Sequence, residues 1–155
     1  MGAGFRDCDG YAVERLPKGA CVTFENLRVY RLAEQVADTA WNITSGWDPF
    51  SRDTVGRQLV RSTDSIGANI AEGFGRGSYQ DNRRFIRISR GSLFETRHWL
   101  RRAFRRNLLN KSQVQEMKSL LDQLGPSLNA YLRSIGTRSN SAASKEGSLP
   151  GTPDQ

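Results

Sequence analysis

The stretch SYQDNRRFIRISRGSLFETRHWLRRAFRR, residues 78–106, repeats apolar side chains every three or four positions. Successive residues of an α-helix are turned by about 100°, so this spacing gathers the apolar side chains on one side of a helix. Ser78 and Asp81 resemble a capping box and predict where the helix begins. The segment is predicted to be a long amphipathic helix with an apolar arc of Phe85, Ile86, Ile88, Ser92, Leu93, Trp99, Leu100, Ala103 and Phe104.

The same segment carries most of the unbalanced charge of the chain. Its nine arginines and two acids, Asp81 and Glu95, leave a charge of +7, which equals the net charge of the whole sequence. Like charges four residues apart on a helix repel one another, so a compensating partner is expected. Arginine suits phosphate oxygens and stacks on unpaired bases. We therefore predict a face that binds nucleic acid, RNA before DNA, made by Arg83, Arg84, Arg87, Arg90, Arg97, Arg101, Arg102, Arg105 and Arg106.

The aromatic residue Phe94 lies in the middle of the arginine stripe, with His98 close by. An aromatic side chain on a polar helix face either packs against another subunit or stacks on a ligand, so both residues are predicted oligomer or stacking contacts. A second function stays open on the same residues. In that alternative the protein is a structural hub for protein interactions, and its arginine face contacts acidic protein partners.

The composition is that of one small domain that assembles with copies of itself. The chain has 155 residues, of which 37% are hydrophobic, a low fraction for a monomer that must build its own core. We therefore expect a homo-oligomer. The sequence shows neither a secretory signal nor a run of roughly 20 apolar residues, which favours a soluble, cytoplasmic protein with no membrane partner.

The sequence offers no pattern of catalytic or metal-binding residues. Cys8 and Cys21 have no Cys or His partner at the spacing of a zinc site, and His98 has no nucleophile or carboxylate partner implied by the sequence. Acids, cysteines and serines nowhere show the spacing of a catalytic site. We expect a protein that is not an enzyme and that has no catalytic residue, metal, cofactor or small-molecule substrate.

Apolar residues follow a helical period along most of the chain, and no segment alternates long enough to predict a sheet. Short connections between helical segments favour antiparallel neighbours. The pattern predicts an all-α fold, an antiparallel up-down-up-down four-helix bundle, with helices over residues 26–45, 52–72, 78–106 and 112–135.

The two ends of the chain differ in composition from this helical region. Residues 1–23 mix glycine, charge and proline without a period, and residues 137–155 are rich in Ser, Gly and Pro. Both are predicted to be mostly disordered, leaving the bundle to residues 24–136.

Turn and cap residues set the predicted boundaries of the helices. Ser51 is predicted to cap the second helix, and Ser112 with Gln115 forms a predicted capping box for the fourth. The glycine-rich segment 73–77 is predicted to be a tight connection between the second and third helices.

Three stretches of the sequence resemble the four helix bundle proteins known as 23S rRNA intervening-sequence proteins. They are SIGANIAEGFGR at residues 65–76, FENLRVYRLA at 24–33 and RFIRISRGSL at 84–93. The resemblance implies an up-down four-helix bundle that assembles as a ring-shaped homopentamer, in a family of which some members are encoded inside rRNA intervening sequences. Related bundles are accessory proteins of diversity-generating retroelements, so the resemblance also implies an association with a reverse transcriptase and nucleic acid.

The motif at residues 65–76 also implies a set of structural residues. Asn69 and Glu72 lie just before the glycine-rich turn, where each is expected to bond backbone amides or an arginine of a partner subunit and to fix how two helices meet. The glycines follow a helix rather than a strand and no Walker lysine is present, which argues against a nucleotide site. The predicted structural set is Ser65, Asn69, Glu72, Gly73, Gly75 and Arg76.

Overall fold

The computed structural model describes residues 23–143, with side chains described for residues 23–135. Within this part the chain is helical and contains no strand, which confirms the predicted all-α four-helix bundle. No helix in it is long and apolar enough to cross a membrane. The elements are a 3₁₀ turn η1 (Phe24–Asn26), α1 (Arg28–Ser45), α2 (Pro49–Ser51), a π-helical segment η2 (Arg52–Gly56), α3 (Arg57–Gly75), α4 (Tyr79–Arg105) and α5 (Lys111–Ala143).

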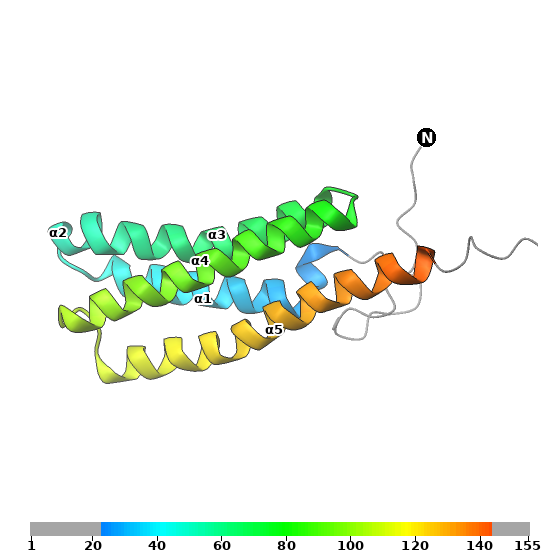
Figure 1. Ribbon diagram of the computed structural model, residues 1–155. Helices are drawn as coiled ribbons and strands as arrows, with labels where there is room; N and C mark the ends of the chain where they lie inside the picture. Colours follow the sequence, from blue (N-terminus) through cyan, green and yellow to red (C-terminus); the bar gives the residue numbers. More distant parts are fainter. Residues whose placement is uncertain (1–22, 144–155) are drawn as a thin grey trace, which may run out of the picture.

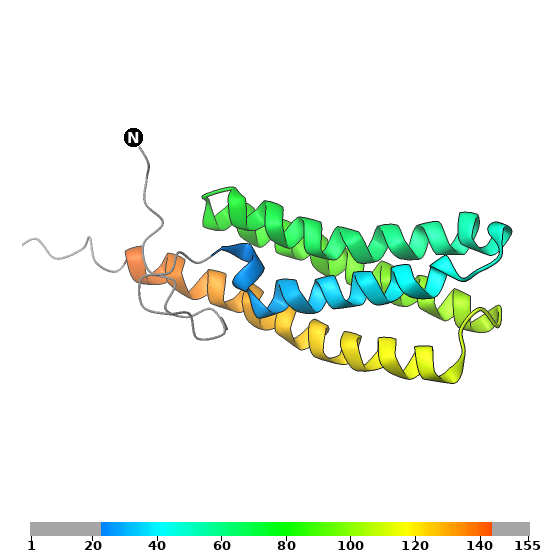
Figure 2. The same ribbon diagram turned by 180° about the vertical axis from the view of Figure 1, so that it is seen from behind.

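The four long helices lie side by side in a bundle, and Figures 1 and 2 show consecutive ones running in opposite directions. Helix α3 packs against α1 and α4, and α5 packs against the same two helices. Each long helix therefore has one side toward the bundle axis and one side toward solvent.

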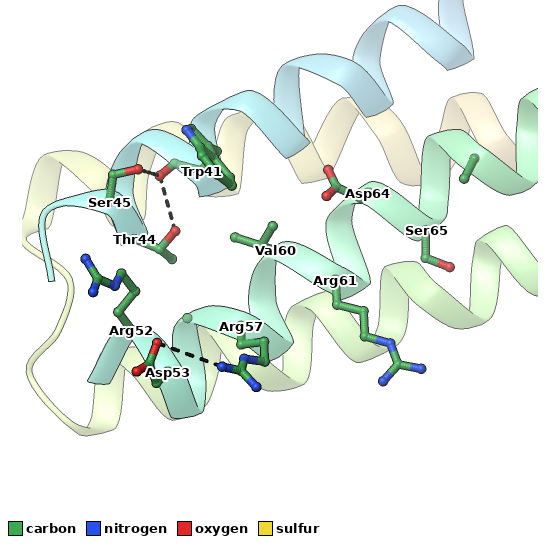
Figure 3. Close-up of a pocket in the computed structure, with 12 residues that line it drawn as sticks. Trp41, Thr44, Ser45, Arg52, Asp53, Arg57, Val60, Arg61, Asp64 and Ser65 are labelled. Atoms are coloured by element: carbon green, nitrogen blue, oxygen red, sulfur yellow. Dashed lines mark hydrogen bonds and ion pairs between the residues drawn. The ribbon is translucent and has the colours of Figure 1, made fainter. Parts of the chain in front are cut away.

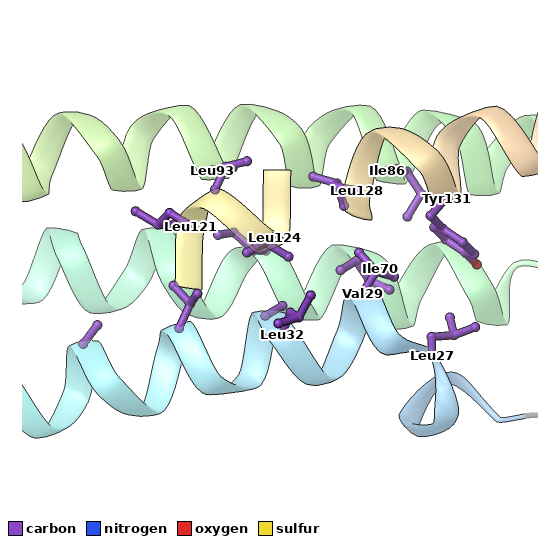
Figure 4. Close-up of a cluster of buried hydrophobic side chains, with 14 of the residues drawn as sticks. Leu27, Val29, Leu32, Ile70, Ile86, Leu93, Leu121, Leu124, Leu128 and Tyr131 are labelled. Carbon is purple, nitrogen blue, oxygen red and sulfur yellow. The ribbon is translucent and has the colours of Figure 1, made fainter. Parts of the chain in front are cut away.

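The core is formed by the apolar stripes of all four long helices (Figure 4). On α5 the buried stripe repeats at steps of three and four residues and consists of Met117, Leu121, Leu124, Leu128, Tyr131 and Ile135. This spacing is that of a bundle seam. Fully buried members of the core include Val36, Leu59, Ile66, Ile70, Ile86, Leu124, Leu128 and Ile135.

The helices begin at caps that the sequence predicted only in part. Ser78 accepts a hydrogen bond from the Asp81 amide at 3.4 Å, as expected. The predicted cap Ser51 is wrong, because Asp48 caps this region by accepting from the Ser51 amide at 3.0 Å, with Pro49 at the first helical position. Proline suits that position because it has no amide hydrogen to satisfy.

The fourth helix begins with a different capping box from the predicted one. Asn110 and Gln113 exchange hydrogen bonds between the side chain of each and the backbone amide of the other, at 2.9 and 3.0 Å. Ser112 therefore lies in the first turn of α5 rather than at its cap. Asn at the cap position and Gln three residues later satisfy two amides reciprocally, as Ser and Gln would.

The glycine-rich segment 73–77 is a turn only at its end. Helix α3 continues through Gly73 and Gly75, and Gly77 takes the left-handed conformation with φ of 69°. A glycine inside a helix costs only about 1 kcal/mol relative to alanine, which packing against a neighbour offsets. The left-handed conformation is reserved largely for glycine, so Gly77 is the residue that reverses the chain.

Helix α5 itself continues past residue 136, the predicted end of the bundle. Helix α5 continues to Ala143, because no proline occurs in this stretch and Gly136 alone does not stop a helix. The rest of the two segments predicted to be disordered, 1–22 and 144–155, lies outside the described residues.

Candidate nucleic-acid interface

The arginine face, defined as the nine predicted arginines, runs along the solvent side of α4 and ends at its C-cap Arg106, with Arg97 and Arg101 at the edge next to α5. All of these side chains are exposed except Arg83, which is half-buried. The opposite side of α4 buries Ile86, Ser89, Leu93 and Thr96. The helical period therefore separates buried and charged side chains as predicted.

The predicted apolar arc of α4 is wider than the side that the bundle buries. Ile88 and Phe104 are 43% and 56% exposed, because they lie at opposite margins of the arc. The buried side instead includes the polar residues Asn82, Ser89 and Thr96.

The charge of the arginine face is not neutralised by the carboxylates described in the structure. Of the two acids in the same segment, Glu95 accepts a hydrogen bond from the Trp99 indole at 3.3 Å. The ion pairs found between residues 23 and 135 all lie elsewhere: Asp53 with Arg57, Glu72 with Arg76, and Asp122 with Lys118. The repulsion between arginines four residues apart must therefore be screened by solvent ions or neutralised by a partner.

Phe94 is an exposed aromatic residue inside this charged surface. Its side chain is 60% exposed, and the Arg97 guanidinium lies over its ring, 5.8 Å from the centroid. The exposed His98 ring packs edge-on against the Trp99 ring, with 5.1 Å between the two ring centroids. In the single chain, Phe94 therefore offers one ring face to a partner.

The predicted structural residues lie mainly where α3 meets α4. Ser65 Oγ lies 3.0 Å from Ser92 Oγ, which joins the two helices directly. Within the described chain the Asn69 side-chain amide donates to the carbonyl and hydroxyl of Ser65 at 2.7 and 3.0 Å rather than bonding backbone amides, and the expected contact with an arginine of a partner subunit stays a prediction. Its role is to orient Ser65 from the next turn of the same helix.

The end of the motif anchors the turn between α3 and α4. Glu72 forms an ion pair with Arg76 of its own chain, and the Arg76 guanidinium lies over the Phe85 ring at 5.1 Å. Gly73 is buried against α4, whereas Gly75 is exposed and a Cβ placed on it would have no other side chain or helix within 4 Å. The motif thus sets the position of α4, and with it the direction of the arginine face.

A ladder of buried hydroxyl groups between α3 and α4 was missed by sequence reasoning. Thr96 Oγ1 donates to Ser62 Oγ at 3.1 Å, and Ser89 Oγ donates to the Ile66 carbonyl at 2.9 Å. The signal was available, because polar residues recur at the same spacing on both helices. Steps of three and four residues separate Ser62, Ser65 and Asn69 on α3, and Ser89, Ser92 and Thr96 on α4.

The outer surface carries a groove between α1, η2 and α3 (Figure 3), and no residue of α4 is among those that line it. Trp41 borders it and is 62% exposed in the single chain. Nearby, in the groove between α1 and α3, burial raises the pKa of the Asp64 carboxyl and the charge of Asp38 raises it further. Within the described residues, no group of three or more His, Cys, Asp and Glu side chains is placed to hold a metal ion.

A second pocket lies between α4 and the first turns of α5, at the end of the arginine face. It has a volume of about 690 Å³, and Arg97, Arg101 and Phe104 of α4 line it. Sequence reasoning did not find it, because half of its lining comes from a different helix.

Comparisons with known proteins agree with this architecture. A family described as 23S rRNA-intervening sequence protein matches residues 25–130. The crystal structure of a protein of unknown function from the S23 ribosomal protein family of Bacteroides thetaiotaomicron is similar in fold, with a TM-score of 0.61 and 22% sequence identity. The alignment covers 68% of this chain and 95% of that one. Among curated proteins, none matches the sequence.

Proposed function

Since the chain belongs to the 23S rRNA-intervening sequence protein family, we propose that it is a non-enzymatic protein that binds nucleic acid, preferably RNA, through the arginine face of α4. The observation that carries the proposal is the exposure of eight of the nine arginines, with none paired to a described carboxylate. An arginine guanidinium can bind two phosphate oxygens at once, so a polyanion would supply the negative charge that the described carboxylates do not.

The length of α4 suits a linear ligand. Its 27 residues extend about 40 Å at 1.5 Å per residue, and arginines occur from its second turn to its last. A backbone with regularly spaced phosphates can follow such a stripe, whereas one small anion would contact a few arginines only.

Phe94 favours RNA with unpaired bases over duplex DNA. Its exposed ring lies between two groups of arginines, where a base freed from pairing could stack on it. A regular duplex keeps its bases inside and offers only phosphates to the same surface.

We also propose that the protein acts as a homo-oligomer, a pentamer by its family resemblance. Trp41 and Phe50 are 62% and 78% exposed in the single chain, and assembly would cover such side chains. Repetition of the arginine face around a ring would raise the avidity for a long nucleic acid. In this form the protein would be an accessory factor of a ribonucleoprotein, such as one containing rRNA or the reverse transcriptase of a diversity-generating retroelement.

The test is a charge reversal on the outermost part of the arginine face. The variant with Arg87, Arg90, Arg101 and Arg105 replaced by Glu should lose retention of RNA at about 0.15 M salt, while its helical circular dichroism stays unchanged. The matched control reverses four exposed arginines outside α4, with the same change in net charge, and should retain RNA. These control positions are Arg28, Arg52, Arg61 and Arg133.

Neutral substitutions at the same positions test whether the arginines contact phosphates directly or act only through the net charge of the protein. Replacing the same four residues of α4 by Gln should flatten the dependence of log K on log salt, by about 0.7 for each phosphate of a single strand that the variant no longer neutralises. Unchanged RNA retention by the charge-reversed protein would refute the proposal. Binding of an acidic protein in place of RNA, with the same arginines required, would favour the alternative of a protein-interaction hub.

A further inference from the structure

The pocket between α4 and α5 has an apolar floor and an aromatic wall. Met117 and Leu121 of α5 form buried parts of the lining, and Leu100 of α4 and Val114 of α5 are half-buried beside them. Phe104 stands at the pocket with 56% of its surface exposed. Its volume of about 690 Å³ lies in the usual range for pockets that hold small organic groups.

The rim of this pocket is cationic and continuous with the arginine face. Arg97 and Arg101 line it from α4, and Lys118 lines it from α5, where it pairs with Asp122 at 2.6 Å. Lys118 therefore has a carboxylate partner, whereas Arg97 and Arg101 have none among the described residues.

Arg97 links the pocket to the exposed Phe94. Its guanidinium lies over the Phe94 ring at 5.8 Å, and its Nη2 atom would lie 3.4 Å from a Cβ placed on Gly125 of α5. The absence of a side chain at Gly125 thus leaves room for Arg97 to extend across the groove between the two helices. A ligand bound along the arginine face would pass this residue before reaching the pocket.

We infer that this pocket accepts one unpaired nucleobase of a strand bound on the arginine face. The base stacks on Phe104, and Arg97 and Arg101 bind the phosphates on either side of it. The inference rests on the proposed function and adds to it a pocket for one base, besides the exposed ring of Phe94. An apolar side chain from a second copy would fill the floor but would leave both arginines uncompensated, whereas a nucleotide matches the floor and the rim together.

The test compares two strands of equal length and charge, a single-stranded oligoribonucleotide and its abasic counterpart. The wild-type protein should bind the oligoribonucleotide more tightly. Phe104→Ala should weaken that binding by about 5- to 150-fold, the effect of losing one stacked base, and should leave binding of the abasic strand unchanged. Phe104→Tyr keeps the aromatic ring and should bind the oligoribonucleotide as tightly as the wild type does.

A matched control removes an exposed ring elsewhere. Phe50→Ala deletes a side chain that is 78% exposed on α2, and any effect it has through assembly should be the same for both strands. If the wild-type protein binds neither strand, the proposed function fails. If it binds both strands equally, or if Phe104→Ala changes only the oligomer mass, the base pocket is refuted and the arginine face remains as a phosphate site.

Discussion

Gly73 of α3 packs directly against Phe85 of α4, so closely that a Cβ at position 73 would lie 2.8 Å from the Phe85 Cβ. The same Cβ would lie 2.9 Å from Asn82 Oδ1, a buried oxygen that has no hydrogen-bond partner in the described part of the chain. The missing side chain at Gly73 therefore sets how closely α3 and α4 approach beside their turn.

Gly73→Ala should destabilise the bundle by about 1–3 kcal/mol, because the added methyl group overpacks the contact between α3 and α4. The measurement is the free energy of unfolding in urea. Gly91→Ala is the matched control on α4, since no atom lies within 4 Å of the Cβ it would add. That control should stabilise the protein by up to about 1 kcal/mol, through helix propensity. Equal effects of the two substitutions would contradict the packing role of Gly73.

The buried hydroxyls of Ser62 and Thr96 should be energetically coupled. Each single change, Ser62→Ala or Thr96→Val, is expected to cost about 1 kcal/mol, and the double variant should cost about 0.5–1.5 kcal/mol less than the sum. Unfolding free energies of the four proteins give the coupling. The control cycle pairs Thr96→Val with Thr44→Val on α1, which does not contact α4. That pair should be additive, and additivity of Ser62 with Thr96 would show that their hydrogen bond contributes nothing.

Ionisation of Asp64 should lower the stability of the protein as pH rises above about 3.9. Burial, with a further contribution from Asp38, raises the pKa of the Asp64 carboxyl in the folded protein. A raised pKa gives a contribution to stability that is complete below about pH 3.9, the pKa of an unfolded Asp, and that is lost as pH rises through the folded value.

Asp64→Asn should therefore be slightly more stable than the wild type at pH 7, and the two proteins should be equally stable below about pH 3.9. The gain is small because solvent reaches the carboxylate. Thermal melts from pH 3 upward measure it. Asp53→Asn, which removes the partner of Arg57, serves as the control and should give no gain. A constant difference between Asp64→Asn and wild type at every pH would contradict the titration.

Much of the fold followed from the order of residues in the chain. The predicted helix over residues 78–106 agrees with α4 (Tyr79–Arg105), and Ser78 caps it as expected. Such features are local, because a period of 3.6 residues decides which side chains share a face of a helix wherever that helix is placed. The separation of the arginines from the buried side of α4 is of this kind. Their role in binding RNA stays a prediction.

Contacts between helices could not be derived in the same way. Gly73 was expected in a turn and is a packing residue inside α3. Asn69 was expected to bond amides or an arginine of a partner subunit, and within the described chain it donates to Ser65. The pocket beside Phe104 needs residues of α4 and α5 at once. Sequence periodicity thus settled which side of each helix is apolar and which is charged. Tertiary packing decided which side chains meet across helices, because such contacts depend on the register and separation of segments that lie far apart in the chain.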